Sequence, residues 1–305
     1  MSHHQSVVRG SDVRAIGCTI VVEWPYSAAA ICRYNAAMNS FPSAPPSVQR
    51  LAGLCGLAAQ DIVLEIVAET GSTNADLLVR AARQELTGAT LLWALRQTAG
   101  RGRAGRSWHS SDDATLTFSL AWPFALSPQQ LAGLPLAVGV AVAQTLAASG
   151  IDVRLKWPND ILRNGDKLAG ILIETAGDKH RRGTIWAVIG IGINLAQSDV
   201  LTAQVGRVVA DASELDSDRE RLMADLLTAL AEVLPFFAEQ GFAAFADAWN
   251  RHDAYAGAPV NIVDQGRVLQ QGTARGVDTS GCLQLDTDQG RVAIAAGDVS
   301  LRIKE

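Results

Sequence analysis

Three arginines are interspersed with glycines in one short segment of the 305-residue sequence, AGRGRAGRSW at residues 99–108. From Gly100 the segment satisfies G-x-G-x-x-G, the spacing of dinucleotide-binding turns, but such a turn must open into a helix whose N-terminus receives the pyrophosphate. Here polar residues and a strand-like alternation follow, and the chain lacks the catalytic-loop and D-F-G motifs of kinases. We therefore assign the chemistry to the guanidinium groups of Arg101, Arg103 and Arg106, which bind phosphate or carboxylate oxygens bidentately.

Cationic and polar side chains recur in three further motifs, KWPND, KLAGILIE and GIGINL. The residues there that could do chemistry are Lys156, Asn159, Asp160, Lys167 and Asn194. Each alone has a structural reading, because Asn-Asp turns are common and a basic segment is often a solvated surface loop. Together with the arginines they predict a site in which a phosphoanhydride and a carboxylate meet, since cations offset the repulsion between two anions.

The elements that must position these residues can be read from hydrophobic periodicity. Strands are predicted over 62–70, 89–97, 114–122, 153–157, 160–174 and 184–195, the fifth being a hairpin turned by Asn164-Gly165. Helices are predicted over 71–86, 128–149, 214–240 and 242–253. The arginine segment thus lies between two strands, and Ser72 or Thr73 caps the first helix.

The sequence pattern changes near residue 256. About five short strand-like runs follow, separated by Asp-Gln-Gly and Thr-Ser-Gly turns, and they predict a small barrel. We expect a mixed α/β domain over 62–255 and an all-β domain over 256–305. Residues 1–61 are expected to be a poorly ordered extension with a Pro/Ser linker, SFPSAPPS.

Composition and charge argue against a nucleic-acid-binding, zinc-binding, membrane or secreted protein. The net charge of −5 gives no sign of a nucleic-acid binder, and four scattered cysteines without a C-x-x-C pair fit a reducing cytoplasm rather than a zinc site. The apolar stretch 131–148 reads as a buried helix rather than a membrane span, and the N-terminus lacks the pattern of a signal peptide. A soluble cytoplasmic protein is expected, with no membrane partner.

Five motifs together resemble those of biotin protein ligases, in the same order and spacing. They are STN (72–74), RQTAGRGRAGRSW (96–108), KWPNDIL (156–162), KLAGILIE (167–174) and IGIGINL (189–195), and the likeness extends from about residue 64 to the C-terminus. The resemblance implies an α+β fold, with a class II aminoacyl-tRNA synthetase-like mixed sheet and helices followed by a small SH3-like β-barrel. It implies two steps: biotin and ATP give biotinyl-5′-AMP and pyrophosphate, and a carrier lysine is then acylated.

The resemblance also implies roles for individual residues. The catalytic set is Lys167, Arg101, Arg103, Asp160 and Lys156. The biotin-binding set is Ser72, Thr73, Asn74, Gln97, Arg101, Gly102, Arg103 and Lys167. The adenylate-binding set is Gly100, Trp108, Asn159, Gly170 and Asn194. Asp160 has two candidate roles, as a ligand of magnesium, directly or through a neighbour, and as acceptor of a proton from the incoming lysine. Trp108 either covers biotin or anchors the end of its loop.

The implied substrates are biotin and ATP with Mg²⁺, and the implied partner is the biotin carboxyl carrier domain of a carboxylase, with no nucleic acid. The sequence leaves monomer and homodimer open, and no motif identifies adenine contacts within 196–217. A lipoate-type acyl-carrier ligase, a ligase that also represses transcription and a binding protein without catalysis are the alternatives. Residues 1–61 do not resemble a winged helix, which favours a monofunctional ligase, and Ala104 stands where some relatives carry a further cation.

Overall fold

The computed structural model describes residues 45–304 except 111–113, 179–182, 197, 207 and 298. Its centre is a seven-stranded sheet with the order β1-β2-β3-β7-β6-β5-β4, in which β1 and β2 are parallel and all other neighbours antiparallel. The strands are β1 (Val63–Thr70), β2 (Thr90–Gln97), β3 (Thr115–Phe124), β4 (Arg154–Lys156), β5 (Asp160–Arg163), β6 (Asp166–Gly177) and β7 (Ile185–Asn194). Every strand predicted within this sheet is present. Asn164 and Gly165 turn the β5–β6 hairpin with positive φ angles of 53° and 91°.

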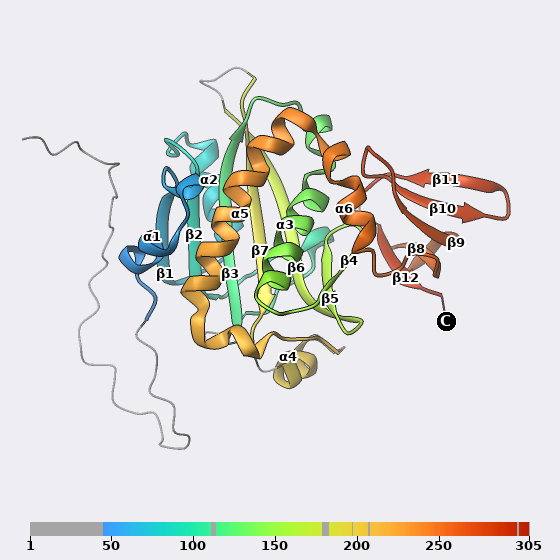
Figure 1. The fold of residues 1–305 in the computed structure, drawn as a ribbon, viewed down its shortest axis with the longest axis horizontal. Coiled ribbons are helices and arrows are strands. Elements are labelled where there is room, and N and C mark those ends of the chain that lie inside the picture. Colours follow the sequence, from blue (N-terminus) through green and yellow to red (C-terminus); the bar gives the residue numbers. More distant parts are fainter. Residues whose placement is uncertain are drawn as a thin grey trace, which may run out of the picture.

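Helices cover both faces of the sheet. On one face lie α3 (Leu134–Ala148) and α5 (Arg219–Gln240), which pack on each other and on the strands around the main hydrophobic core (Figure 1). On the other face α2 (Thr73–Ala82) packs on β3, β6 and β7 around a smaller core that includes Leu77 and Trp186. The apolar segment Pro128–Ala148 is long enough to cross a membrane, but 67% of it is buried inside the protein, as expected of a core helix.

All four predicted helices differ in part from the observed ones. The predicted helix 128–149 is interrupted: one 3₁₀ turn, Pro128–Leu131, precedes α3. The interruption falls at Gly133, where a Cβ atom would lie 2.5 Å from Cβ of Phe242, so the backbone must approach that side chain closely. The helix predicted over 71–86 ends at Ala82. The helix predicted over 214–240 is α5, which begins only at Arg219, after a 3₁₀ segment, Ser213–Asp218. The helix predicted over 242–253 is a 3₁₀ turn, Phe242–Phe245, followed by α6 (Ala246–Arg251), and α4 (Ser198–Val205) was not predicted.

The expectation of a poorly ordered segment up to residue 61 is wrong for its last part. Residues 1–44 lie outside the described residues, but α1 (Val48–Leu54) packs against α5 and β1. Its Leu51 is fully buried, and the backbone N–H of Ser47 donates to Glu220 at the start of α5 over 2.7 Å. A short helix without a strong amphipathic pattern gave no sequence signal, because its stability comes from this packing.

We expect Leu51→Ala to lower the free energy of unfolding by about 2–5 kcal/mol, because it removes a buried side chain and leaves a cavity. Urea denaturation followed by circular dichroism measures the change. Leu57→Ala is the matched control: its side chain is 84% exposed, and its effect should stay within about 0.5 kcal/mol. Equal effects of the two substitutions would mean that α1 does not contribute to the folded core.

The chain ends in a five-stranded antiparallel sheet with the order β11-β10-β9-β8-β12. Its strands are β8 (Pro259–Asp264), β9 (Arg267–Val277), β10 (Leu283–Thr287), β11 (Gly290–Ile294) and β12 (Ser300–Ile303). Among the described residues no strand pairing joins β11 to β12, so the small sheet is observed and a closed barrel is not. The indole N–H of Trp157, from the KWPND motif, donates to the carbonyl of Gly281 over 3.2 Å and ties this sheet to the main body.

Candidate active site

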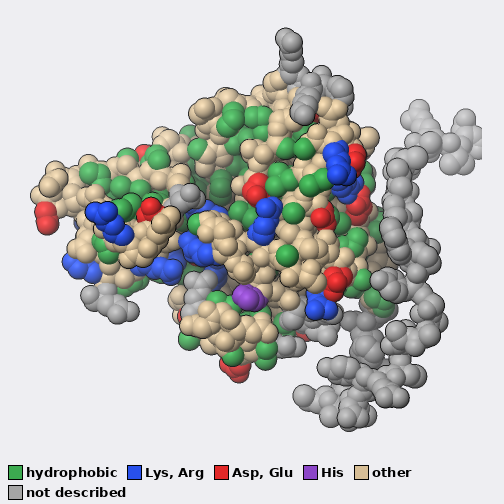
Figure 2. All heavy atoms as spheres, turned by 180° about the vertical axis from the view of Figure 1, so that it is seen from behind, with side chains coloured by type: hydrophobic (Ala, Val, Ile, Leu, Met, Phe, Trp, Pro, Cys, Tyr) green, Lys and Arg blue, Asp and Glu red, His purple; other side chains and the backbone are tan. Residues whose placement is uncertain are grey.

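A cavity of about 1020 Å³ opens where the C-terminal sheet meets the large sheet, and Lys and Arg side chains gather at this junction (Figure 2). Residues from every motif of the sequence analysis line it. Its walls are the start of α2, the segment between β2 and β3, the β4–β6 hairpins, strand β7 and, from the C-terminal sheet, the β8–β9 turn and residues 299–302. All the predicted site residues except Gly100 are among the lining residues.

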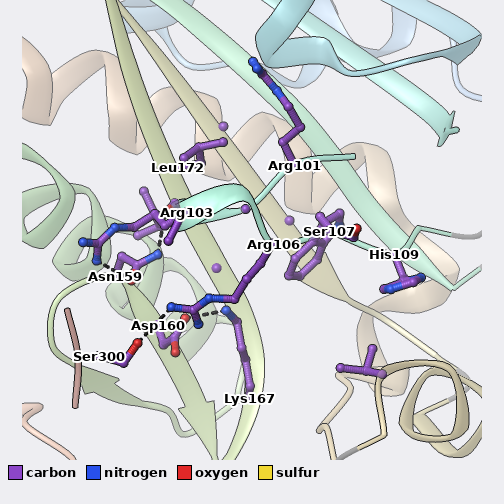
Figure 3. A pocket seen from close by; sticks show the side chains of 18 of the residues that line it. Arg101, Arg103, Arg106, Ser107, His109, Asn159, Asp160, Lys167, Leu172 and Ser300 are labelled. Atoms are coloured by element: carbon purple, nitrogen blue, oxygen red, sulfur yellow. Dashed lines mark hydrogen bonds and ion pairs between the residues drawn. The ribbon is translucent and has the colours of Figure 1, made fainter. Parts of the chain in front are cut away.

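Asp160 lies between Lys156 and Lys167 at one end of the cavity, and Figure 3 shows it beside Lys167. Lys167 Nζ contacts its Oδ1, and Lys156 Nζ lies 3.5 Å from its Oδ2. The strands explain this convergence, because Lys156 and Asp160 are paired across β4 and β5 while Gly170 is opposite Asp160 on β6. A Cβ at Gly170 would lie 3.0 Å from Lys167 Nζ, so the glycine leaves room for the ammonium group.

Burial lowers the pKa of Lys156, and the nearby carboxylate of Asp160 opposes that shift. The positive charges of Arg302 and Lys167 add to the lowering. A cluster of cations that partly repel each other around one carboxylate is the arrangement expected where an anionic ligand binds, because the ligand supplies the missing negative charge.

The Gly/Arg loop, defined as residues 100–108, forms a small hairpin over the cavity. The N–H of Gly102 donates to the carbonyl of Arg106 over 2.7 Å, and that of Trp108 donates to Gly100 over 2.9 Å. At its tip Ala104 has a positive φ of 52°. The loop follows a strand and leads to another strand, so the rejection of a dinucleotide turn is confirmed.

The three arginines of this loop point in different directions (Figure 3). Arg103 donates to Asn159 Oδ1 over 3.1 Å and to the carbonyl of Gly297, and Arg106 donates to Ser300 Oγ over 2.8 Å. These two side chains therefore bridge the loop to the KWPND motif and to the C-terminal sheet. Arg101 instead pairs with Glu174 on β6, away from Lys167.

Uncharged polar side chains form the opposite end of the cavity. Ser72 is the N-cap of α2 and accepts from the N–H of Ala75, which is the capping role expected from sequence. Thr73 N–H donates to Gln97 Oε1 over 2.8 Å, and the Thr73 hydroxyl lies 2.7 Å from Ser119 Oγ. Ser119, on β3, was not found from the sequence, because nothing in an alternating strand distinguishes it from a buried serine.

The glycines of β7 make room for protein side chains. A Cβ at Gly190 would lie 2.3 Å from Asn74 Oδ1, and one at Gly192 would lie 2.3 Å from the Trp108 ring. The indole N–H of Trp108 is buried and has no hydrogen-bond partner among the described residues, and Lys167 Nζ lies 5.8 Å from the centre of the ring. In this structure Trp108 anchors the end of the loop inside the cavity.

Asn194 has a structural role in the observed geometry. Its amide donates to the carbonyls of Lys167 and Ala210 over 3.3 and 2.9 Å, which joins the end of β7 to the start of β6. Three further lining or neighbouring residues, Glu174, Ser300 and Arg302, were not identified from the sequence as site residues. The last two lie in the C-terminal sheet, and only the tertiary fold brings them to the cavity.

Among the described residues, no group of three His, Cys, Asp or Glu side chains could hold a magnesium ion. Asp160, for which magnesium binding is one of the two roles left open by the sequence, already faces two ammonium groups. That setting suits an anion and disfavours a second cation. The role of Asp160 as a magnesium ligand is therefore not supported by the residues present.

Comparisons with known proteins agree with these motifs. The sequence model of the biotin/lipoate A/B protein ligase family matches residues 68–194, and that of the biotin protein ligase C terminal domain matches residues 255–302. The chain is 36% identical to the bifunctional ligase/repressor BirA of Escherichia coli, covering 77% of this chain and 72% of BirA. It is 34% identical to the biotin–[acetyl-CoA-carboxylase] ligase of Paracoccus denitrificans, covering 77% and 98%.

Solved structures give the same result for the fold. The structure titled biotin protein ligase from Aquifex aeolicus in complex with biotin and ATP aligns with a TM-score of 0.66 at 29% identity. The alignment covers 79% of this chain and 99% of the Aquifex chain.

Proposed function

Because this chain belongs to the biotin protein ligase family, we propose that it activates biotin with ATP and transfers the biotinyl group to the acceptor lysine of a biotin carboxyl carrier domain. The observation that carries this proposal is one cavity with two chemically different ends. One end gathers Lys156, Asp160 and Lys167, and the other presents Thr73 and Gln97. The first end suits two reacting anions, and the second suits the neutral polar ring of biotin.

In the first step the carboxylate of biotin attacks the α-phosphorus of ATP, and pyrophosphate leaves. Lys167 is assigned to the oxygens of that carboxylate and of the α-phosphate, and Arg103 and Lys156 are further cations for the phosphate side. Their charge is in place before reaction, so it stabilises the transition state without reorganisation. Magnesium would enter with ATP and neutralise the phosphates that leave.

In the second step the neutral amine of the carrier lysine attacks the acyl carbon of biotinyl-5′-AMP, an amide bond forms, and AMP leaves. The amine must lose a proton, and Asp160 is assigned as its acceptor because its carboxylate lies at the end of the cavity where the anhydride forms. The ammonium groups of Lys156 and Lys167 hold the Asp160 carboxylate in position before the amine arrives.

ATP–pyrophosphate exchange with biotin or lipoate as the acid substrate tests the first step and separates this proposal from a lipoate-type ligase. We expect exchange with biotin only. Incubation of the full chain with biotin, Mg-ATP and a carrier domain, read as a mass shift on the acceptor lysine, tests the second step. Exchange with lipoate alone would replace the proposal by the lipoate reading.

Arg103→Gly is expected to release biotinyl-5′-AMP and to label lysines of unrelated proteins. Arg103 holds the Gly/Arg loop to Asn159 and Gly297, and a lid that stays closed keeps water and stray amines from a mixed anhydride. Mass spectrometry of a panel of non-carrier proteins measures the labelling. Arg291→Gly, at an exposed arginine of β11 outside the cavity lining, is the control and should label only the carrier. Equal selectivity of Arg103→Gly and the unsubstituted protein would count against the lid.

The proposal also includes the domain boundaries and the fold type of the C-terminal domain. We assign residues 62–255 to the catalytic domain and residues 256–305 to a C-terminal domain of SH3-like barrel type. The two sheets and the two family matches support the division. A cytoplasmic location and a monomer or homodimer complete the expectation, and size-exclusion chromatography with light scattering measures the oligomeric state.

Repression of transcription is the second candidate function, and it is favoured by the 36% identity to a relative named as ligase and repressor. The chain spans 98% of the Paracoccus denitrificans protein and 88% of a Mycobacterium tuberculosis protein, both named as ligases alone, against 72% of BirA. A mobility shift of operator DNA that requires biotin and ATP would establish the repressor function.

A further inference from the structure

A chain of hydrogen bonds links the Gly/Arg loop to the polar end of the cavity, and Glu174 is its branch point. Glu174 Oε2 accepts from Arg101 Nη2 over 2.9 Å and from Asn74 Nδ2 over 3.0 Å. Asn74 Nδ2 also lies 3.3 Å from the carbonyl of Leu172. A carboxylate and a carbonyl can only accept, so the amide nitrogen of Asn74 must face β6 and its oxygen must face the opposite way.

The orientation of Asn74 determines the direction of the next two hydrogen bonds. Its Oδ1 accepts from Ser119 Oγ over 2.6 Å. Ser119 has one hydroxyl proton, which this bond uses, so across the 2.7 Å contact with Thr73 the hydroxyl of Thr73 must be the donor. Gln97 Oε1, 3.0 Å from the same hydroxyl, is also an acceptor, so the proton of Thr73 is directed into the protein by either partner.

The polar end of the cavity therefore presents a fixed pattern to a ligand. Thr73 Oγ1 has no proton left to give and can only accept. Gln97 Oε1 is occupied by the backbone N–H of Thr73, so the amide nitrogen of Gln97 is the side that can donate. An acceptor beside a donor matches a ureido ring, whose N–H groups flank a carbonyl oxygen.

We propose that Glu174 is a positioning residue that fixes these proton directions and thereby makes the cavity selective for a neutral ureido ring. The inference rests on the proposed function and adds a selectivity determinant to it. Without the acceptor at residue 174, only Leu172 orients the amide of Asn74, and the amide can turn over and donate to Ser119. The proton of Ser119 then turns to Thr73, whose own proton is shared between Gln97 Oε1 and the ligand, so Thr73 no longer acts only as an acceptor.

The test compares biotin with a cyclic carbamate analogue, in which an oxygen acceptor replaces a ring N–H of the ureido group. The measured quantity is the ratio of kcat/KM for the two acids in ATP–pyrophosphate exchange by the full chain. Glu174→Met keeps the length of the side chain and removes the acceptor, and should lower the ratio about tenfold or more, mainly through the KM for biotin. Glu174→Gln should stay within about twofold, because its amide oxygen can accept from both Arg101 and Asn74.

Two controls separate this role from a general structural one. Glu69→Met removes a carboxylate that pairs with Arg96 over 3.1 Å on β1, outside the cavity lining, and should leave the ratio unchanged. In an Asn74→Ala background Glu174→Met should have little further effect on the ratio, since Glu174 acts through Asn74. Thermal unfolding checks that each variant is folded, and Glu174→Ala carries the same expectation if the methionine variant is not.

The outcomes are distinguishable. A ratio that is equal in Glu174→Met and the unsubstituted protein overturns the proposal, and so does a loss in Glu174→Gln as large as that in Glu174→Met. The proposal is also overturned if Glu174→Met lowers the ratio of kcat/KM as strongly in the Asn74→Ala background as it does alone. Absence of exchange with biotin in the unsubstituted protein would instead contradict the proposed function itself.

Discussion

Lys167→Ala is expected to lower the rate of biotin-dependent pyrophosphate exchange about a hundredfold while leaving the chain folded. Lys167 is the cation at the centre of the reactive end: it contacts Asp160, lies below the Trp108 ring and has room made for it by Gly170. The transition state of adenylation brings a carboxylate and a phosphate together, and removal of one preorganised charge from such a site costs about 3 kcal/mol, or about a hundredfold in rate. Exchange of radioactive pyrophosphate into ATP measures the loss.

The fold should tolerate this substitution because Lys156 still faces Asp160. Lys304→Ala is the control, since Lys304 near the C-terminus is exposed and lies 3.3 Å from Gln271. It should retain the rate of the unsubstituted protein. Near-normal exchange by Lys167→Ala would remove Lys167 from the mechanism, and a large fall in its melting temperature would show that the loss reflects unfolding.

Gly190→Ala should weaken biotin binding strongly, with a KM for biotin raised about tenfold or more. The added methyl carbon would lie 2.3 Å from Asn74 Oδ1, closer than such atoms approach in proteins, so the amide of Asn74 must move. That amide cannot move without breaking its bonds to Ser119, Glu174 and the carbonyl of Leu172. Steady-state exchange kinetics with biotin varied at saturating ATP measure the effect.

Gly177→Ala is the matched control for this substitution. It places the same methyl group on a glycine of the same sheet, at the end of β6, where a Cβ would meet nothing within 4 Å. It should leave the KM for biotin unchanged. An unaltered KM in Gly190→Ala would mean that Asn74 does not contribute to the polar end of the cavity.

Much of the fold could be predicted because its signals are local. The β5–β6 hairpin follows from Asn164-Gly165, since few residue pairs accept positive φ at both turn positions, and the strand-loop-strand context of the arginines excluded a dinucleotide site. The break before α3 could not be predicted in this way. It depends on contact between Gly133 and Phe242, residues far apart in the sequence.

The site residues likewise divide into those with local sequence signals and those whose roles depend on contacts between distant parts of the chain. Motif residues such as Lys156, Asp160 and Lys167 were found because strand pairing brings neighbours in the sequence together. Glu174 was read only as part of a strand, because its importance depends on Asn74, a hundred residues away. Arg101 was predicted to share the phosphate site, but its side chain pairs with Glu174.

The attachment of the C-terminal sheet has a consequence for how this enzyme can be divided. Trp157 is held by Gly281, Arg106 by Ser300, and the β8–β9 turn forms part of the cavity wall. A fragment that stops at residue 255 would keep every sequence motif. It would lack the part of the cavity wall that the C-terminal sheet provides, so its cavity would be open to solvent on that side. In chimeras between relatives, the last fifty residues should therefore be exchanged together with the arginine hairpin they brace, as one transferable cassette.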